Sequence, residues 1–203
     1  MFGHAWSTIG WRVLLIVVSL ALWFITQKMI GARKLDGNAI YDHLHVLTAG
    51  WNAWLHQNPR TANALLVASS LGVDAVTLFV LIYAVCGPSF TPFWGLFGLF
   101  ALRQASQATV ALPIPEGVIW RDPGVPSLFV TYGVGNDLFF SGHTALAVCG
   151  AIIIATLGIP VLSLAAALLA LFQVVVVIVL RAHWTMDVVA GLFAALAVGS
   201  VFL

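Results

Sequence analysis

The residues able to do acid–base and nucleophilic chemistry fall in two short clusters in the second half of the chain. Residues 135–143 read Gly-Asn-Asp-Leu-Phe-Phe-Ser-Gly-His and bring an acid, a hydroxyl and a histidine to the point where a loop gives way to an apolar run. In the second cluster an acid follows a histidine by four residues, so His183 and Asp187 share one face of a helix. Two histidines in one pocket, each near a carboxylate, suit two-step group transfer. One imidazole attacks and the other protonates the leaving oxygen.

Other polar residues suit the two tasks that accompany such chemistry. A carboxylate on the far ring nitrogen fixes the tautomer of a histidine, and Asp187 can do this for His183. The candidates for His143 are Asp137 and Glu116. The N–H groups at the start of a helix bind phosphate, and arginines add charge-assisted hydrogen bonds. We therefore expect phosphate to contact Ser141, Gly142, Arg103, Arg121 and Arg181.

Each of these residues also has a structural interpretation. His143 can cap a helix or lie at the membrane interface, His183 and Asp187 can form a structural pair, and Arg181 can be an anchor that flanks a span. Arg103 falls inside an apolar run, where it is costly unless it faces a polar cavity or a partner such as Asp74. The gathering of these residues on one face of a chain with few polar residues favours a functional site.

Composition places this site in a membrane protein. Hydrophobic residues make up 62% of the chain and charged residues 7%, and the mean hydropathy is +1.06; soluble domains carry about a quarter charged residues. The net charge of +1 and the lack of a basic stripe or nucleic-acid motif argue against a nucleic-acid partner. Cys86 and Cys149 both fall in apolar runs, where packing is the expected role.

The hydropathy pattern predicts an all-α, polytopic membrane protein: one domain, 1–203, folded as a six-span helical bundle. The first span is retained and is not a signal peptide, and an amphipathic helix lies in the interface between the first and second spans. If the run from 144 to 180 crosses the bilayer twice, both histidine clusters lie near the same membrane surface. The predicted segments are spans at about 13–26, 61–86, 92–112, 138–157, 161–180 and 184–203, an amphipathic stretch at 33–60, and an irregular proline-rich loop at 112–135.

The distribution of basic residues suggests which side that surface faces. Four basic residues flank spans on the catalytic side, against Arg12 on the other, and the positive-inside rule then favours a cytoplasmic active site. The four are Lys28, Arg33, Lys34 and Arg60.

No metal or cofactor is expected. His43 and His45, together with the second cluster, offer possible ligands, but the chain has neither a His-Glu-x-x-His pattern nor clustered cysteines. We therefore predict chemistry by side chains alone.

Three motifs in order carry a resemblance: residues 103–115 (RQASQATVALPIP), 135–144 (GNDLFFSGHT) and 183–189 (HWTMDVV). The series resembles that of the sphingomyelin synthase-related lipid phosphotransferases, within the type 2 phosphatidic acid phosphatase superfamily. This branch includes the plant phosphatidylcholine:diacylglycerol cholinephosphotransferases. The resemblance covers the chain from Arg103 to the C-terminus.

The resemblance implies a six-span bundle without a metal cofactor and a triad of His143, His183 and Asp187. By analogy, His183 is the nucleophile that forms a phosphohistidine-type intermediate, and His143 handles the leaving and incoming hydroxyls. Asp137 matches the acid before the Ser-Gly-His motif, and Glu116 is a looser match. The chain lacks the Lys-x6-Arg-Pro pattern of the phosphatases, and Arg181 precedes His183 by two residues in place of six.

The leading hypothesis is therefore transfer of phosphocholine or phosphoethanolamine from a glycerophospholipid to a lipid alcohol, such as diacylglycerol or ceramide. Its partners are the lipid donor, the lipid acceptor and the surrounding membrane lipids. The alternatives are a lipid phosphate phosphatase that uses water, and a non-enzymatic lipid-binding or transport protein. Apolar residues around the clusters offer an occluded lipid site with a loop as lid: Phe139, Phe140, Trp184, Ile114, Val118, Ile119 and Trp120.

Overall fold

The computed structural model describes residues 40–110, 112–130, 132 and 138–202. The chain divides into two compact units, Met1–Tyr41 and Asp42–Leu203, and the second carries the helices described here. All regular secondary structure in the described residues is helical, which confirms the all-α class. The helices are α2 (His43–Leu47), α3 (Ala49–Gln57), α4 (Pro59–Cys86), α5 (Thr91–Thr109), α6 (Gly142–Ala155), α7 (Pro160–Val179) and α8 (Thr185–Phe202).

Local sequence fixes where these helices start. Proline stands in the first turn of α4, α5 and α7, where its missing N–H costs nothing and its fixed φ suits a helix. Side chains cap two others: Asp42 accepts from the first turn of α2, and the Ser141 hydroxyl accepts from Thr144 N in α6. The first histidine cluster therefore lies at the start of α6, and the second lies at the start of α8.

Three helices, α4, α7 and α8, are long and apolar enough to cross a membrane, and α6 is a shorter apolar helix. The chain is accordingly a membrane protein. The span predicted at 92–112 forms α5, which is not among the three helices long and apolar enough to cross a membrane. The span predicted at 13–26 lies outside the described residues. The described part of the amphipathic stretch forms two short helices, α2 and α3.

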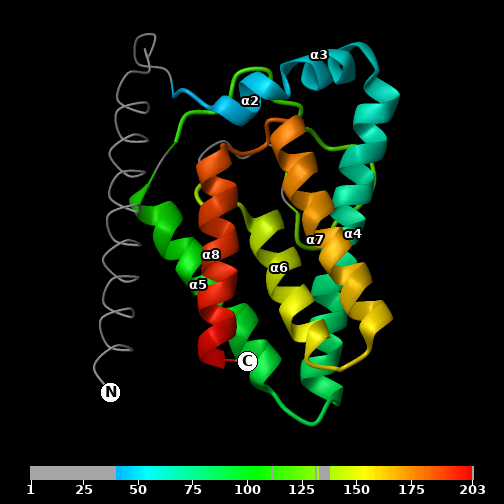
Figure 1. Cartoon of the computed structure of the whole chain (residues 1–203), viewed down its shortest axis with the longest axis vertical. Coiled ribbons are helices and arrows are strands. Elements are labelled where there is room, and N and C mark those ends of the chain that lie inside the picture. Colours follow the sequence, from blue (N-terminus) through cyan, green and yellow to red (C-terminus); the bar gives the residue numbers. More distant parts are fainter. Residues whose placement is uncertain (1–39, 111, 131, 133–137, 203) are drawn as a thin grey trace, which may run out of the picture. The chain divides into compact units, whose positions relative to one another are not determined.

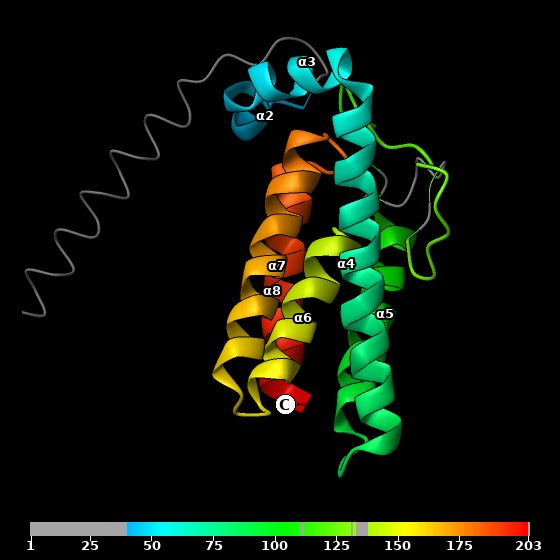
Figure 2. The same cartoon turned by 90° about the vertical axis from the view of Figure 1, so that its right-hand side faces the viewer.

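Helix α6 lies at the centre of the helical unit, where it packs against α4, α7 and α8 (Figure 1). Helix α5 packs on α8 and α4. The short helices α2 and α3 lie across the end of the bundle where α7 turns into α8 (Figures 1 and 2). His143 in the first turn of α6 and His183 just before α8 therefore belong to the same end of the bundle.

Two glycines let the helices approach closely around α6. A Cβ at Gly150 would lie 2.0 Å from a methyl of Val76 on α4. A Cβ at Gly191 would lie 2.7 Å from the carbonyl oxygen of Ser141. Close to this second contact, Ser141 N donates to the carbonyl of Asp187 at 3.0 Å. The starts of α6 and α8, which carry His143 and Asp187, are therefore joined through their backbones.

Gly191→Ala should destabilise the protein by ~1–3 kcal/mol, because the new methyl meets a backbone oxygen that cannot rotate away. Thermal unfolding of the purified protein in detergent measures the effect. Gly50→Ala on α3 is the matched control: its Cβ would meet nothing within 4 Å, and alanine is the better helix former. Equal melting temperatures for Gly191→Ala and wild type would contradict the close α6–α8 contact.

Candidate active site

His143 is buried in the first turn of α6, with 9% of its surface exposed. Its ring meets the ring of Trp120 edge to face, with 4.9 Å between the ring centroids. Its Nε2 is buried and has no hydrogen-bond partner among the residues that the structure describes. A buried polar atom left unpaired is costly, and such atoms are common where a substrate supplies the missing partner.

His183 and Asp187 lie together, as their spacing predicts. His183 Nδ1 is 3.6 Å from Asp187 Oδ2, an ion-pair distance that is longer than a hydrogen bond. The same Oδ2 accepts from Trp184 N at 3.0 Å, so the carboxylate also caps α8. Asp187 is fully buried, and its Oδ1 has no partner among the described residues. A buried carboxylate is best stabilised by a nearby cation, and an imidazole that gains charge during a reaction provides one.

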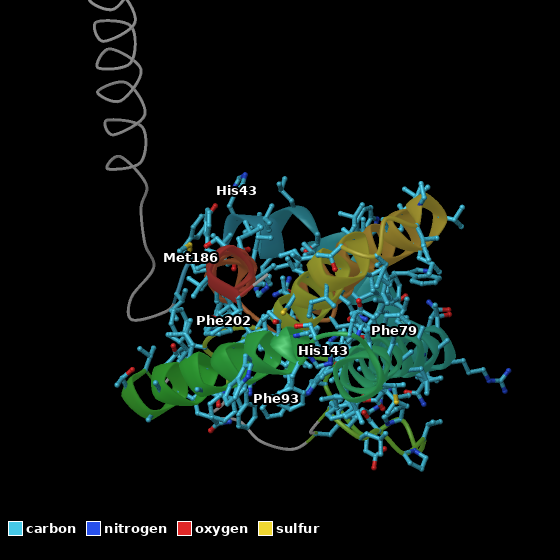
Figure 3. All side chains as sticks on the ribbon, turned by 90° about the horizontal axis from the view of Figure 1, so that it is seen from below. His43, Phe79, Phe93, His143, Met186 and Phe202 are labelled. Carbon is cyan, nitrogen blue, oxygen red and sulfur yellow. The ribbon has the colours of Figure 1, made fainter. Side chains whose placement is uncertain are left out.

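Both histidines line one cavity of about 350 Å³, the size of a small-molecule pocket. Figure 3 shows His143 in the interior of the bundle, whereas His43 lies at the periphery. Of the aromatic residues expected around the site, only Trp120 is in the cavity wall; Phe139, Phe140 and Trp184 are not. Most of the wall is apolar. The lining residues include Val73, Thr77 and Leu81 of α4, Phe93, Phe97, Phe100 and Arg103 of α5, Phe129 of the long loop, and Gly142 and Leu146 of α6.

Among the expected phosphate ligands, Arg103 and Gly142 are in the cavity wall. Arg103 Nε donates to the carbonyl of Phe140 at 3.1 Å, and a Cβ on Gly142 would lie 3.0 Å from the same nitrogen. The guanidinium thus lies against the start of α6, at the two residues on either side of Ser141. Asp74, the partner considered for Arg103, accepts hydrogen bonds from residues 127–129 of the loop.

Four other expected residues are not part of the cavity wall: Ser141, Arg121, Arg181 and Glu116. Arg121 donates to Asn63 at 2.7 Å, and Arg181 donates to the carbonyls of Glu116 at 2.9 Å and His45 at 3.1 Å. Glu116 is itself exposed. The Arg181 contacts fasten the loop and α2 to the turn before His183, and the Arg121 contact fastens the loop to α4. Asp137 lies outside the described residues.

Two residues of α2 that the sequence analysis did not assign to the site support His183 from outside. Asp42 accepts from the N–H and the hydroxyl of Thr185, each at 2.6 Å. His45 Nε2 lies 3.0 Å from the carbonyl oxygen of His183, and its ring stacks on Trp184. The sequence offers one clue, because Asp42 is a capping residue just before a helical segment. For His43 and His45 it suggests only metal binding.

The surroundings of Asp42 and His45 shift the pKa of each side chain. Burial acts to raise the pKa of Asp42, but hydrogen bonds from the side chain and backbone of Thr185 outweigh it, and the pKa is lowered. Burial lowers the pKa of His45 despite the nearby Asp42 carboxylate. At neutral pH Asp42 is thus ionised and His45 neutral, with a proton on Nε2 to donate to His183 O. In the described residues, no three His, Cys, Asp or Glu side chains gather as a possible metal site.

A bundle with helices of membrane-spanning length has two buried histidines and an arginine around an apolar cavity, and a carboxylate beside one of the histidines. These are features expected of a membrane enzyme that acts on phosphate-bearing lipids. A family model described as AtPDCT1/2, the phosphatidylcholine:diacylglycerol cholinephosphotransferases, matches residues 41–202. The chain belongs to this family and is a lipid headgroup phosphotransferase. The match confirms the predicted family and extends it upstream to α2. No curated protein and no solved structure gives a significant match.

Proposed function

We propose that this protein moves phosphocholine or phosphoethanolamine from a glycerophospholipid to the hydroxyl of diacylglycerol or ceramide through a phosphohistidine intermediate. The observation that carries the proposal is that His143 and His183 line the same apolar cavity, with Arg103 in its wall. Family membership supports headgroup transfer in general.

In the first step, His183 attacks the phosphorus of the donor. Because Nδ1 is on the side of Asp187, the attacking atom is Nε2. The P–N bond forms as the bond from phosphorus to the glycerol oxygen breaks. The leaving oxygen takes a proton from protonated His143, which releases diacylglycerol. Asp187 stabilises the positive charge that develops on His183.

The second step reverses the roles of the groups. The acceptor hydroxyl attacks phosphorus and gives its proton to His143, while the P–N bond breaks and its electron pair returns to His183. Arg103 and the start of α6 at Gly142 and Ser141 neutralise the phosphate oxygens in both steps. Arg121 and Arg181, whose guanidinium groups hold Asn63 and the carbonyls of Glu116 and His45, act by positioning the loop.

His183→Gln should lower turnover by at least about a thousandfold, because the covalent route is lost. Asp187→Asn should lower it by ~10²–10⁴-fold and leave a trace, because the amide oxygen still accepts from Trp184 N while the charge is gone. His43→Gln, at an exposed position on α2, is the control. Initial rates with purified protein and phosphatidylcholine measure all three.

Enzyme incubated with labelled donor and then denatured at alkaline pH, where the P–N bond survives, should carry the label on His183. A labelled adduct on His143 would instead make His143 the nucleophile and His183 the acid–base catalyst. An active His183→Gln enzyme would rule out the mechanism.

The nature of the acceptor tests the function itself. An apolar cavity favours a lipid alcohol over water at the intermediate. Purified enzyme given phosphatidylcholine and labelled diacylglycerol or ceramide should move the label into phospholipid, with free phosphocholine as a minor product. Release of phosphocholine as the main product at saturating lipid acceptor would identify a hydrolase.

We also propose a multi-pass topology with the catalytic end toward the cytoplasm, from the excess of basic residues flanking the predicted spans on that side. Ser89 lies between α4 and α5 at the opposite end. With Cys86 replaced by serine, S89C should react with an impermeant maleimide added outside intact cells. Labelling only after permeabilisation would reverse the orientation.

A further inference from the structure

Asp74 is a buried acid near the middle of α4, a helix long and apolar enough to cross a membrane. An ionisable group at that position is costly unless it has partners, so its contacts indicate a function. Its Oδ2 accepts from Leu128 N at 2.8 Å and from the Ser127 hydroxyl at 3.0 Å. Its Oδ1 accepts from Phe129 N at 3.0 Å. One carboxylate thus holds three consecutive residues of the long loop.

These residues are not helical, yet they lie beside the middle of α4, where the loop runs along the helix (Figure 2). Non-helical backbone at such a depth requires a partner for every N–H. Asp74 pairs Leu128 N and Phe129 N, the Ser127 hydroxyl accepts from Val130 N at 3.2 Å, and Pro126 has no N–H, so three of the four N–H groups in segment 126–130 have these partners. The exposed side chain of Leu128 is apolar and suits contact with lipid tails. These contacts suit a segment that packs against the middle of an apolar helix.

The same segment is part of the cavity wall. Phe129, whose N–H is bound to Asp74, lines the cavity with Val73 and Thr77, which stand before and after Asp74 on α4. His143 and His183 line it as well. The carboxylate of Asp74 thus determines where one wall stands relative to the reacting histidines.

We propose that Asp74 sets the acceptor specificity of the enzyme, by holding segment 126–130 as a wall that excludes water from the phosphohistidine. The inference rests on the proposed function and deepens it. If the wall moves, water reaches the intermediate, its oxygen attacks phosphorus and its proton goes to His143. The P–N bond then breaks, its electron pair returns to His183, and free phosphocholine leaves. With the wall in place, the diacylglycerol hydroxyl makes the same attack and phospholipid forms. Asp74 is a positioning residue, because it acts through Phe129.

The test is the ratio of free phosphocholine to new phospholipid, measured from choline-labelled phosphatidylcholine and a diacylglycerol of different acyl mass. Asp74→Asn keeps the size of the side chain but leaves one acceptor oxygen, and its amide NH₂ cannot accept from a backbone N–H. The ratio should rise about tenfold, the factor expected when the two barriers shift by about 1.4 kcal/mol relative to each other. A purely structural defect lowers both products together and leaves the ratio unchanged.

Asp122→Asn is the matched control. Asp122 also binds loop backbone, with Gly124 N at 2.8 Å from its Oδ1, but it is exposed and does not line the cavity. Its ratio should equal that of wild type. Ser127→Ala removes the hydroxyl between Asp74 and Val130 without changing α4, so it should raise the ratio by a smaller factor.

An unchanged ratio in Asp74→Asn overturns the inference, even if total activity falls. If Asp74→Asn does not accumulate as folded protein, the product ratio of Ser127→Ala is the test. An unchanged ratio in that variant overturns the inference. Failure of the proposed function looks different, because wild-type enzyme then makes no phospholipid from diacylglycerol at all.

Discussion

The buried carboxyl group of Asp187 connects the parts of the site. Its Oδ2 accepts from Trp184 N and faces His183 Nδ1 at 3.6 Å, while its main-chain carbonyl accepts from Ser141 N. One residue thus caps α8, orients the histidine that precedes it, and joins that helix to the start of α6. Through these side-chain and main-chain contacts, α8, the His183 turn and the first turn of α6 form one unit that fixes the positions of the two histidines relative to each other.

Around this unit the protein uses polar contacts where other proteins use apolar packing. Lipid tails are as apolar as leucine, so helices in a bilayer gain little from burying apolar surface and depend on close packing and hydrogen bonds. Helix α4 shows this: Ser69 bonds to Gln173 of α7 at 2.6 Å, Ser70 bonds to the Tyr132 hydroxyl, and Asp74 holds segment 126–130. One polar face of α4 therefore carries both the bundle contact and the loop.

The sequence predicted the helices well wherever apolar runs end at proline or glycine. Helix α7, expected at 161–180, is Pro160–Val179. Helix α6 starts later than expected because Leu138, Phe139 and Phe140 continue the apolar pattern while Ser141 makes the cap. The pairing of His183 with Asp187 followed from helical spacing. The roles of Asp42, His45 and Asp74 did not, because each depends on contacts between residues far apart in the chain, which no local pattern encodes.

Long-range contacts also distinguish two arginines, Arg103 and Arg181, which have different hydrogen-bond partners. The sequence analysis expects both Arg103 and Arg181 to contact phosphate, although only Arg103 falls inside an apolar run. Arg181 donates to two main-chain carbonyls, which orient its guanidinium toward the loop and α2. Arg103 comes from α5, across the bundle, and meets the α6 start from the cavity side. In the proposed mechanism, the cation on the cavity wall contacts phosphate in both steps, and the cation bound to carbonyls outside the wall positions the loop. The side of the backbone from which each arginine approaches is the basis for proposing these two different roles.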